Sequence, residues 1–165
     1  MSAAAGDAAS VSVFVPLSPV EAFEVFTAEI DEWWRRGPAF RSSGRRPSRM
    51  TLEPGVGGRL IEHVEGARGP RTIEFGRVTG WEPGERIALE WRNVNFAADE
   101  KTVVEVTFRH SSDGTLVTVR HSGWSAIRDD HPARHGHVGA AFSRFLGLWW
   151  GDLATALREH VSARS

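Results

Sequence analysis

The chain has 165 residues, a formal net charge of −1, no cysteine and no tyrosine. This length suffices for one domain with a buried core, and the near-zero charge gives no electrostatic reason to expect nucleic acid or an anionic membrane as a partner. The missing cysteines exclude disulfides, thiolate catalysis and cysteine metal sites. No apolar run approaches the roughly 20 residues of a membrane span, so we expect no membrane insertion.

The first ten residues, MSAAAGDAAS, are small or polar and lack the apolar stretch of a secretory signal. We therefore expect residues 1–10 to be a disordered tail. A single domain over residues 11–162 of a cytoplasmic protein is the organisation that the rest of the chain predicts.

The first elements are a strand and two short helices. Alternating valines over residues 11–15 predict a strand that stops at Pro16. Ser18-Pro19-Val20-Glu21 is a capping-box pattern with proline at the first helical position, which predicts a helix through about Thr27. A second helix is expected over 28–34. The arginine- and serine-rich stretch that follows Gly37-Pro38, up to Ser48, is interpreted as a loop.

From residue 49 onward the pattern is typical of antiparallel strands. Short alternating runs are separated by Pro-Gly, Gly-Gly and Asp-Gly signals, and Asp113-Gly114 is the expected last hairpin turn. The predicted strands cover residues 50–53, 59–64, 73–81, 86–92, 102–110 and 115–121. Strands that are segregated from helices in this way indicate an α+β domain.

Residues 138–161 carry large apolar side chains at three- and four-residue spacing, which predicts an amphipathic helix packed on the sheet. The expected apolar stripe contains Phe142, Phe145, Trp149, Leu153, Ala156 and Leu157. Adjacent helical residues point about 100° apart, so Trp149 and Trp150 cannot both face inward. We expect Trp149 inside and Trp150 near the rim or at a partner surface.

Six segments in this order and spacing resemble a known superfamily. They are SPVEAFEVFT with the following Trp33-Trp34, EPGVGGRL, GRVTGWEPGERIALEW, TVVEVTF, GTLVTVRHSGW and WWGDLATAL. Together they resemble the START-like or SRPBCC superfamily, and within it the activator of heat-shock-protein-90 ATPase homologues. The resemblance implies a helix-grip fold, in which a curved antiparallel sheet of about six to seven strands wraps around a long C-terminal helix, with two short helices after the first strand.

The resemblance also implies an apolar cavity between sheet and helix. Members of the superfamily include lipid carriers, hormone receptors and aromatic polyketide cyclases. Our leading hypothesis is a binder of a small apolar or aromatic molecule without a fixed cofactor. An acid-base enzyme of the cyclase type is an alternative, and it needs an acid and a base that converge on one pocket.

A protein-interaction module is the third alternative. It predicts a filled core and an exposed apolar patch, around Trp124 and Trp150. In the co-chaperone that names the branch, a second, N-terminal domain makes much of the chaperone contact, and this chain has no room for it. Chaperone contact is therefore not expected, and a homodimer is left open.

The candidate cavity walls are aromatic side chains, which could equally be plain core: Trp34, Phe40, Trp91, Phe142, Phe145 and Trp149. His121 and Arg77 are the candidates for orienting a ligand. His121 shares a strand face with Val117 and Val119, where it could transfer a proton or simply be a hydrogen-bonded residue at the strand end. For Glu62, Glu74 and Arg77, the scarcity of buried charge favours the solvated face.

Three histidines lie in one loop, at positions 131, 135 and 137, just after Asp129 and Asp130. Two histidines and a carboxylate are adequate zinc ligands. The spacing crosses a proline and a glycine, however, and fits no motif of fixed geometry. We interpret the segment as a solvated loop before the terminal helix and expect no metal.

Overall fold

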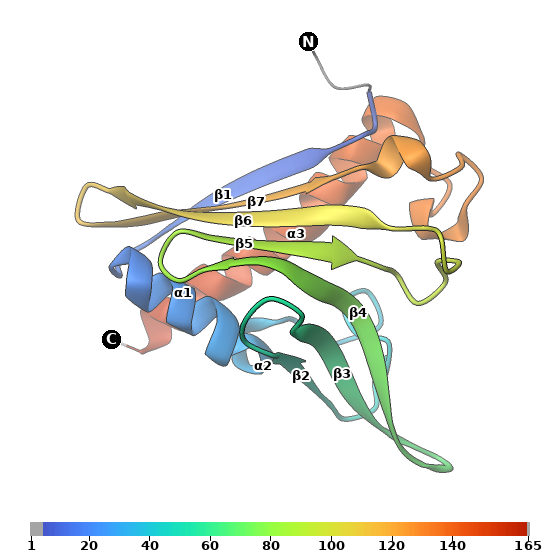
Figure 1. Ribbon diagram of the computed structural model, residues 1–165, viewed down its shortest axis with the longest axis horizontal. Coiled ribbons are helices and arrows are strands. Elements are labelled where there is room, and N and C mark those ends of the chain that lie inside the picture. The colour runs from blue at the N-terminus through green and yellow to red at the C-terminus, as the bar shows by residue number, and fades with distance from the viewer. Residues whose placement is uncertain (1–4, 165) are drawn as a thin grey trace.

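The computed structural model describes residues 5–164 and contains one seven-stranded antiparallel sheet in the order β1-β7-β6-β5-β4-β3-β2 (Figure 1). The elements are β1 Ala9–Val15, α1 Pro19–Ala28, α2 Ile30–Trp33, β2 Ser48–Leu52, β3 Arg59–Gly66, β4 Gly69–Glu82, β5 Arg86–Trp91, β6 Thr102–Ser111, β7 Gly114–Ser122, the 3-10 turns η1 Trp124–Ala126 and η2 Pro132–Arg134, and α3 Gly139–Ala163. The predicted α+β class, strand number and helix order are confirmed.

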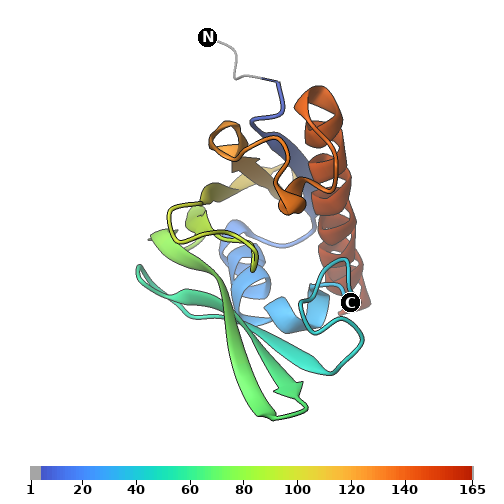
Figure 2. The ribbon, with the colours of Figure 1, turned by 90° about the vertical axis from the view of Figure 1, so that its right-hand side faces the viewer.

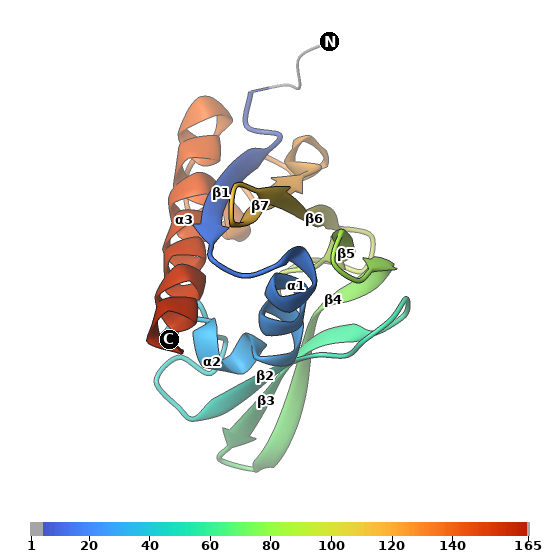
Figure 3. The ribbon, with the colours of Figure 1, turned by 90° about the vertical axis from the view of Figure 1, so that its left-hand side faces the viewer.

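The sheet curls, and its concave side holds the helices (Figure 2). The long helix α3 runs beside β1, while α1 and α2 lie between α3 and the β2–β3 end of the sheet (Figure 3). This arrangement is the helix-grip fold. None of the helices within residues 5–164 combines the length and apolar character that crossing a membrane requires.

The capping box of α1 forms as the sequence predicts. The backbone amide of Glu21 donates to Ser18 Oγ at 3.2 Å, and the amide of Ser18 donates to Glu21 Oε1 at 3.3 Å. These two bonds fix the start of α1. The helix then places Phe23 and Phe26 against Phe108 of β6, with ring centroids 5.2 and 5.7 Å apart.

Two boundaries differ from the sequence-based expectation. Strand β1 already begins at Ala9, inside the expected tail, and Asp7 Oδ1 accepts bonds from the amide and hydroxyl of Ser125 at 3.0 and 2.6 Å. The expected tail's residues 1–4 lie outside the described residues. The β6–β7 turn sits at Ser112-Asp113, since Ser111 pairs with Gly114. Gly114 is thus a strand residue, and a Cβ there would lie 2.4 Å from the backbone oxygen of Val15.

The 34–47 loop is fixed by a buried arginine. The Arg41 guanidinium donates to Asp31 Oδ1 at 2.7 Å and to the backbone oxygen of Trp34 at 2.9 Å. It also donates to the backbone oxygen of Ser48 at 3.2 Å, while Asp31 Oδ1 accepts from the amide of Met50 at 2.8 Å. One ion pair therefore joins the loop, α2 and β2.

Irregular pairing on both sides of β4 changes which side chains face inward. Leu60 pairs with Gly76 and Ile61 with Glu74, so Phe75 is an extra residue. After this bulge, Glu74 and Arg77 both point to the solvent side, where Arg77 Nη2 donates to Glu74 Oε1 at 2.8 Å.

The expectation for Glu62 is wrong, because its side chain is fully buried. Its carboxylate accepts hydrogen bonds from the amides of Ser42 and Ser43 at 2.9 and 3.0 Å. A buried carboxylate needs such donors, and here the 34–47 loop supplies them. The sequence-based assignment to the solvated face does hold for Glu74 and Arg77.

Candidate ligand-binding site

The buried stripe of α3 is rotated relative to the sequence-based expectation. It consists of Phe142, Leu146, Trp150, Leu153, Leu157 and Val161. Trp150 is 3% exposed, whereas Trp149 is only partly buried. The expectation of Trp149 inside and Trp150 at the rim is therefore wrong. Each indole has its own acceptor: Trp150 Nε1 donates to His121 Nδ1 at 3.1 Å, and Trp149 Nε1 donates to the backbone oxygen of Ala39 at 2.7 Å.

Four indoles from three separate parts of the chain form one tryptophan cluster: Trp34, Trp91, Trp149 and Trp150. The ring centroids of Trp149 and Trp150 are 5.0 Å apart, and that of Trp34 lies 5.9 Å from each of them. Trp91 is 5.8 Å from Trp150. Phe40 stacks on Trp149 at 5.5 Å and is itself partly buried. The cluster thus extends from the half-exposed pair Phe40–Trp149 to the buried interior.

His121 lies at the buried end of this cluster and is 1% exposed. Because an indole can only donate, Trp150 fixes Nδ1 of His121 as the acceptor. Nε2 then carries the proton and donates to Thr102 Oγ1 at 2.7 Å. Burial lowers the pKa of His121 from 6.5 to about 3. The imidazole is neutral and both of its nitrogens are in use, which suits a structural role.

Three of the predicted site residues lie away from the tryptophan cluster: the wall residues Phe142 and Phe145, and the polar candidate Arg77. Phe142 is buried against Trp124, with centroids 4.7 Å apart. Phe145 is partly buried and stacks on His137 at 4.8 Å, so it covers the histidine loop. Arg77 lies on the outer face of the sheet, paired with Glu74, and cannot orient a ligand between sheet and helix. The structure brings together Trp34, Phe40, Trp91, His121 and Trp149.

Buried apolar side chains pack between α3 and the sheet. A remaining cavity of about 10 Å³ is lined by Phe26, Trp33, Val119, Trp150 and Leu157, among others. A volume of roughly 10–15 Å³ is needed for a single water molecule. A cavity of this size admits a ligand only if side chains move, and Phe40 and Trp149 are partly buried rings of the neighbouring aromatic cluster.

The interaction-module alternative predicts an exposed apolar patch around Trp124 and Trp150, yet both are buried, at 2% and 3% exposure. Trp124 Nε1 has no hydrogen-bond partner among the residues that the structure describes. Thr102, the second partner of His121, gives no signal in the sequence. Spacing carries no signal for a pairing between an indole and an imidazole that lie 29 residues apart.

The histidine loop is organised by its first histidine. His131 is 2% exposed; its Nδ1 accepts from the amide of Ala133 at 3.0 Å, and its Nε2 donates to Glu100 Oε1 at 3.1 Å. His131 therefore caps η2 with one nitrogen and binds the 92–101 loop with the other. His135 and His137 instead lie against Phe145. The expectation of a solvated loop is wrong for His131.

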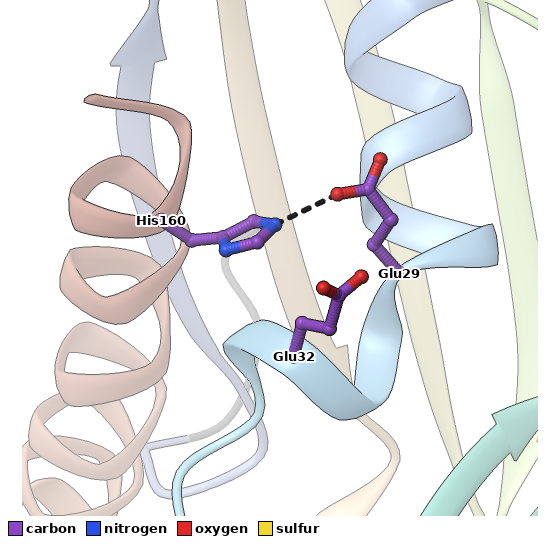
Figure 4. Close-up of side chains that lie close together, drawn as sticks. All are labelled: Glu29, Glu32 and His160. Carbon is purple, nitrogen blue, oxygen red and sulfur yellow. Dashed lines mark hydrogen bonds and ion pairs between the residues drawn. The ribbon is translucent and has the colours of Figure 1, made fainter. Parts of the chain in front are cut away.

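A different group of donors comes together at the far end of α3. Ligand atoms of Glu29, Glu32 and His160 lie within 4.8 Å of one another (Figure 4). His160 Nε2 donates to Glu29 Oε1 at 2.9 Å, and the guanidinium of Arg164 also binds the Glu29 carboxylate. Arg164 is the main cause that lowers the pKa of Glu29. The arrangement is an ion-pair network that links α3 to the junction of α1 and α2. Its central carboxylate, Glu29, is already paired with the guanidinium of Arg164.

The curled sheet, the long C-terminal helix and the apolar interface between them define a helix-grip domain of the SRPBCC class. Residues 16–146 match the family described as "Activator of Hsp90 ATPase homolog 1-like protein". The chain belongs to this family. Comparison with curated proteins gives no match.

Solved structures support the same fold. An HSP90 activator from Plasmodium falciparum aligns with a TM-score of 0.62 and 14% identity, covering 94% of this chain and 96% of that chain. The Aha1 dimer from Colwellia psychrerythraea gives 0.59 and 13%, covering 93% and 95%. DynU16, from the dynemicin biosynthetic locus, gives 0.61 and 18%, covering 94% of this chain and 47% of that one. Identities this low establish the fold alone.

Proposed function

We propose that the protein binds a small apolar or aromatic molecule at the tryptophan cluster, and that it does so by displacing Phe40 and Trp149. The observation that carries the proposal is the continuous run of aromatic rings from these two half-exposed side chains to Trp34 and Trp91. Aromatic walls with few polar groups are typical of small-molecule sites. A cytoplasmic location and the absence of a fixed cofactor stay predictions.

The affinity of such a site for a ligand depends on the free energy needed to move Phe40 and Trp149 out of the positions that they occupy in the structure. The ligand gains about 25 cal/mol per Å² of buried apolar surface, and it must offset the cost of moving the Trp149 indole away from its bond to Ala39. A site that is open only part of the time binds with an affinity reduced by the open fraction. Removing the displaced ring should therefore strengthen binding.

A neutral fluorescent probe, Nile red, tests this directly. We expect Trp149→Ala to bind the probe at least tenfold more tightly than the wild type, because the indole no longer has to move. Leu148→Ala is the matched control, since Leu148 is the neighbouring helical residue and is 67% exposed. Trp91→Ala should weaken binding by removing a wall. If Trp149→Ala binds no better than Leu148→Ala, the proposal fails. Native mass spectrometry of freshly purified protein would then identify any molecule that co-purifies.

A second candidate is a protein-interaction module, and the filled interior favours it. One structural neighbour is an HSP90 activator, so the test is the ATPase rate of a purified ninety-kilodalton heat-shock chaperone with and without this protein. An unchanged rate at saturating concentration would remove that candidate. An acid-base enzyme receives less support, because His121 is neutral and both of its nitrogens are already bonded.

A further inference from the structure

A separate groove of about 490 Å³ lies between the 34–47 loop and the tip of the β3–β4 hairpin. The loop contributes Ser42, Ser43 and Arg46 to its lining, and the hairpin contributes Val64, Arg68 and Arg71. The lining residues of the two segments are at least 18 positions apart in sequence. Unlike the tryptophan cluster, this groove is open without any rearrangement.

The groove is positively charged. Residues 41–49 and 66–72 together contain six arginines and neither aspartate nor glutamate. Of the acidic residues in the adjoining strand, Glu62 is buried and its carboxylate is held by the amides of Ser42 and Ser43. Glu65 alternates with Val64 along β3 and so projects from the opposite face. The lining of the groove therefore carries three guanidiniums and no carboxylate.

These arginines differ from three others that lie in the strands. Arg59, Arg77 and Arg86 each form ion pairs with neighbouring glutamates at 2.8–3.0 Å. Among residues 5–164, no carboxylate lies within 4.0 Å of the guanidiniums of Arg46, Arg68 and Arg71, and none of the three makes a side-chain hydrogen bond. Their donors are available for a ligand.

The segments that carry these arginines are held in place before any ligand arrives. Arg41 and Glu62 anchor the loop, and Ser43 Oγ lies 3.1 Å from Ser48 Oγ. In the hairpin, Val64 pairs with Arg71 and Gly66 with Gly69. A preorganised site loses less conformational entropy on binding than a mobile one.

We propose that this groove binds a small organic phosphate, with Arg46, Arg68 and Arg71 donating to the phosphate oxygens. Guanidiniums form strong, paired hydrogen bonds with phosphate oxygens. A groove of this volume is larger than a phosphate group, which leaves room for an organic part beside Val64 and the glycine backbone. The site is separate from the tryptophan cluster and does not depend on ligand binding there.

Isothermal calorimetry with inorganic pyrophosphate as the probe tests the site at 50 and 150 mM NaCl. We expect one binding event for the wild type and at least tenfold weaker binding for Arg46→Gln with Arg71→Gln. The control is Arg109→Gln with Arg158→Gln, which removes the same charge from exposed positions on β6 and α3. This control should bind within twofold of the wild type.

Three results would overturn the proposal: no binding of pyrophosphate by the wild type, equal weakening in both double variants, or binding only to phosphatidic acid vesicles. The second result would mean general electrostatic attraction, and the third a membrane surface. If the groove variant does not fold, NMR of arginine side-chain N–H signals in the wild type decides the matter. Pyrophosphate should shift the signals of Arg46, Arg68 and Arg71 and leave that of Arg109 in place.

Discussion

The tryptophan cluster and the arginine groove are built from the same 34–47 loop, and they are opposite in character. Phe40 stacks on Trp149 in the cluster, while Ser42, Ser43 and Arg46 line the groove. The cluster side is neutral and the cavity next to Trp150 measures only about 10 Å³, whereas the groove is charged and open at about 490 Å³. Of these two spaces, the one that can hold a small molecule without rearrangement lies beside the hairpin and not between α3 and the sheet.

The largest effect is expected for Trp150→Ala, which removes a buried ring from the tryptophan cluster. Its indole is 3% exposed and contacts Trp34, Trp91 and His121. Truncating such a side chain should lower the free energy of unfolding by about 3–5 kcal/mol, as measured by urea denaturation. It also leaves Nδ1 of His121 without a donor. A loss below about 1 kcal/mol would mean that the interior is not tightly packed; exposed Leu148→Ala, the control, should change little.

Arg41→Ala removes the side chain that holds the 34–47 loop in place. Arg41 lies between Phe40 and Ser42 and is the anchor of both regions, with its side chain 1% exposed and its partner Asp31 28% exposed. Breaking a buried ion pair costs about 3–5 kcal/mol; because Asp31 reaches solvent, we expect about 2 kcal/mol. Hydrogen exchange should quicken at the amide of Met50, which bonds to Asp31. Unchanged exchange there would contradict the anchoring role.

The neutral state of His121 predicts a pH dependence of stability. An unfolded histidine binds a proton below about pH 6.5, whereas His121 stays neutral down to about pH 3 in the folded protein. The unfolded state therefore holds more protons in this window, and stability falls as the pH is lowered through it, by up to about 1.4 kcal/mol per pH unit. Urea unfolding at pH 7, 6 and 5 should show a slope that His121→Gln reduces. Parallel slopes for the two proteins would disprove the assignment.

The smallest expected effect belongs to the groove. Arg46→Gln with Arg71→Gln should change the free energy of unfolding by less than about 0.5 kcal/mol per substitution, because both side chains are exposed and neither forms an ion pair or a side-chain hydrogen bond within residues 5–164. Denaturation curves that coincide with that of the wild type would show that the groove arginines do not stabilise the fold, which is the result expected for a ligand site. A loss above 2 kcal/mol would show that the arginines stabilise the fold instead.

The order and type of the elements could be predicted from the sequence because local signals decide them. The Ser18 capping box starts α1, and alternating strands end at glycine turns. The orientation of α3 could not, because Trp149 and Trp150 are equally apolar and periodicity fits both. Hydrogen bonds to Ala39 and His121, both distant in sequence, decide which indole is buried.

The sequence does not decide which side chains of β4 point toward the core, and the reason is a bulge in the strand. The bulge at Phe75 places Glu74 and Arg77, three residues apart, on the same side of the sheet. Simple alternation would put them on opposite sides. The sequence assigns Glu62 to the wrong face because its partners are backbone amides of a loop 19 and 20 residues away. The pattern of side chains carries no information about such backbone donors.

The bonds made by Asp31 and Arg41 have a consequence for self-association. Strand β2 is one edge of the sheet, and unpaired edge strands invite another chain to add alongside. Here the amide of Met50 and the carbonyl oxygen of Ser48 are already bonded to Asp31 and Arg41. A second copy can pair with β2 at these positions only by displacing these two hydrogen bonds, so this part of the sheet edge is protected against edge-to-edge aggregation.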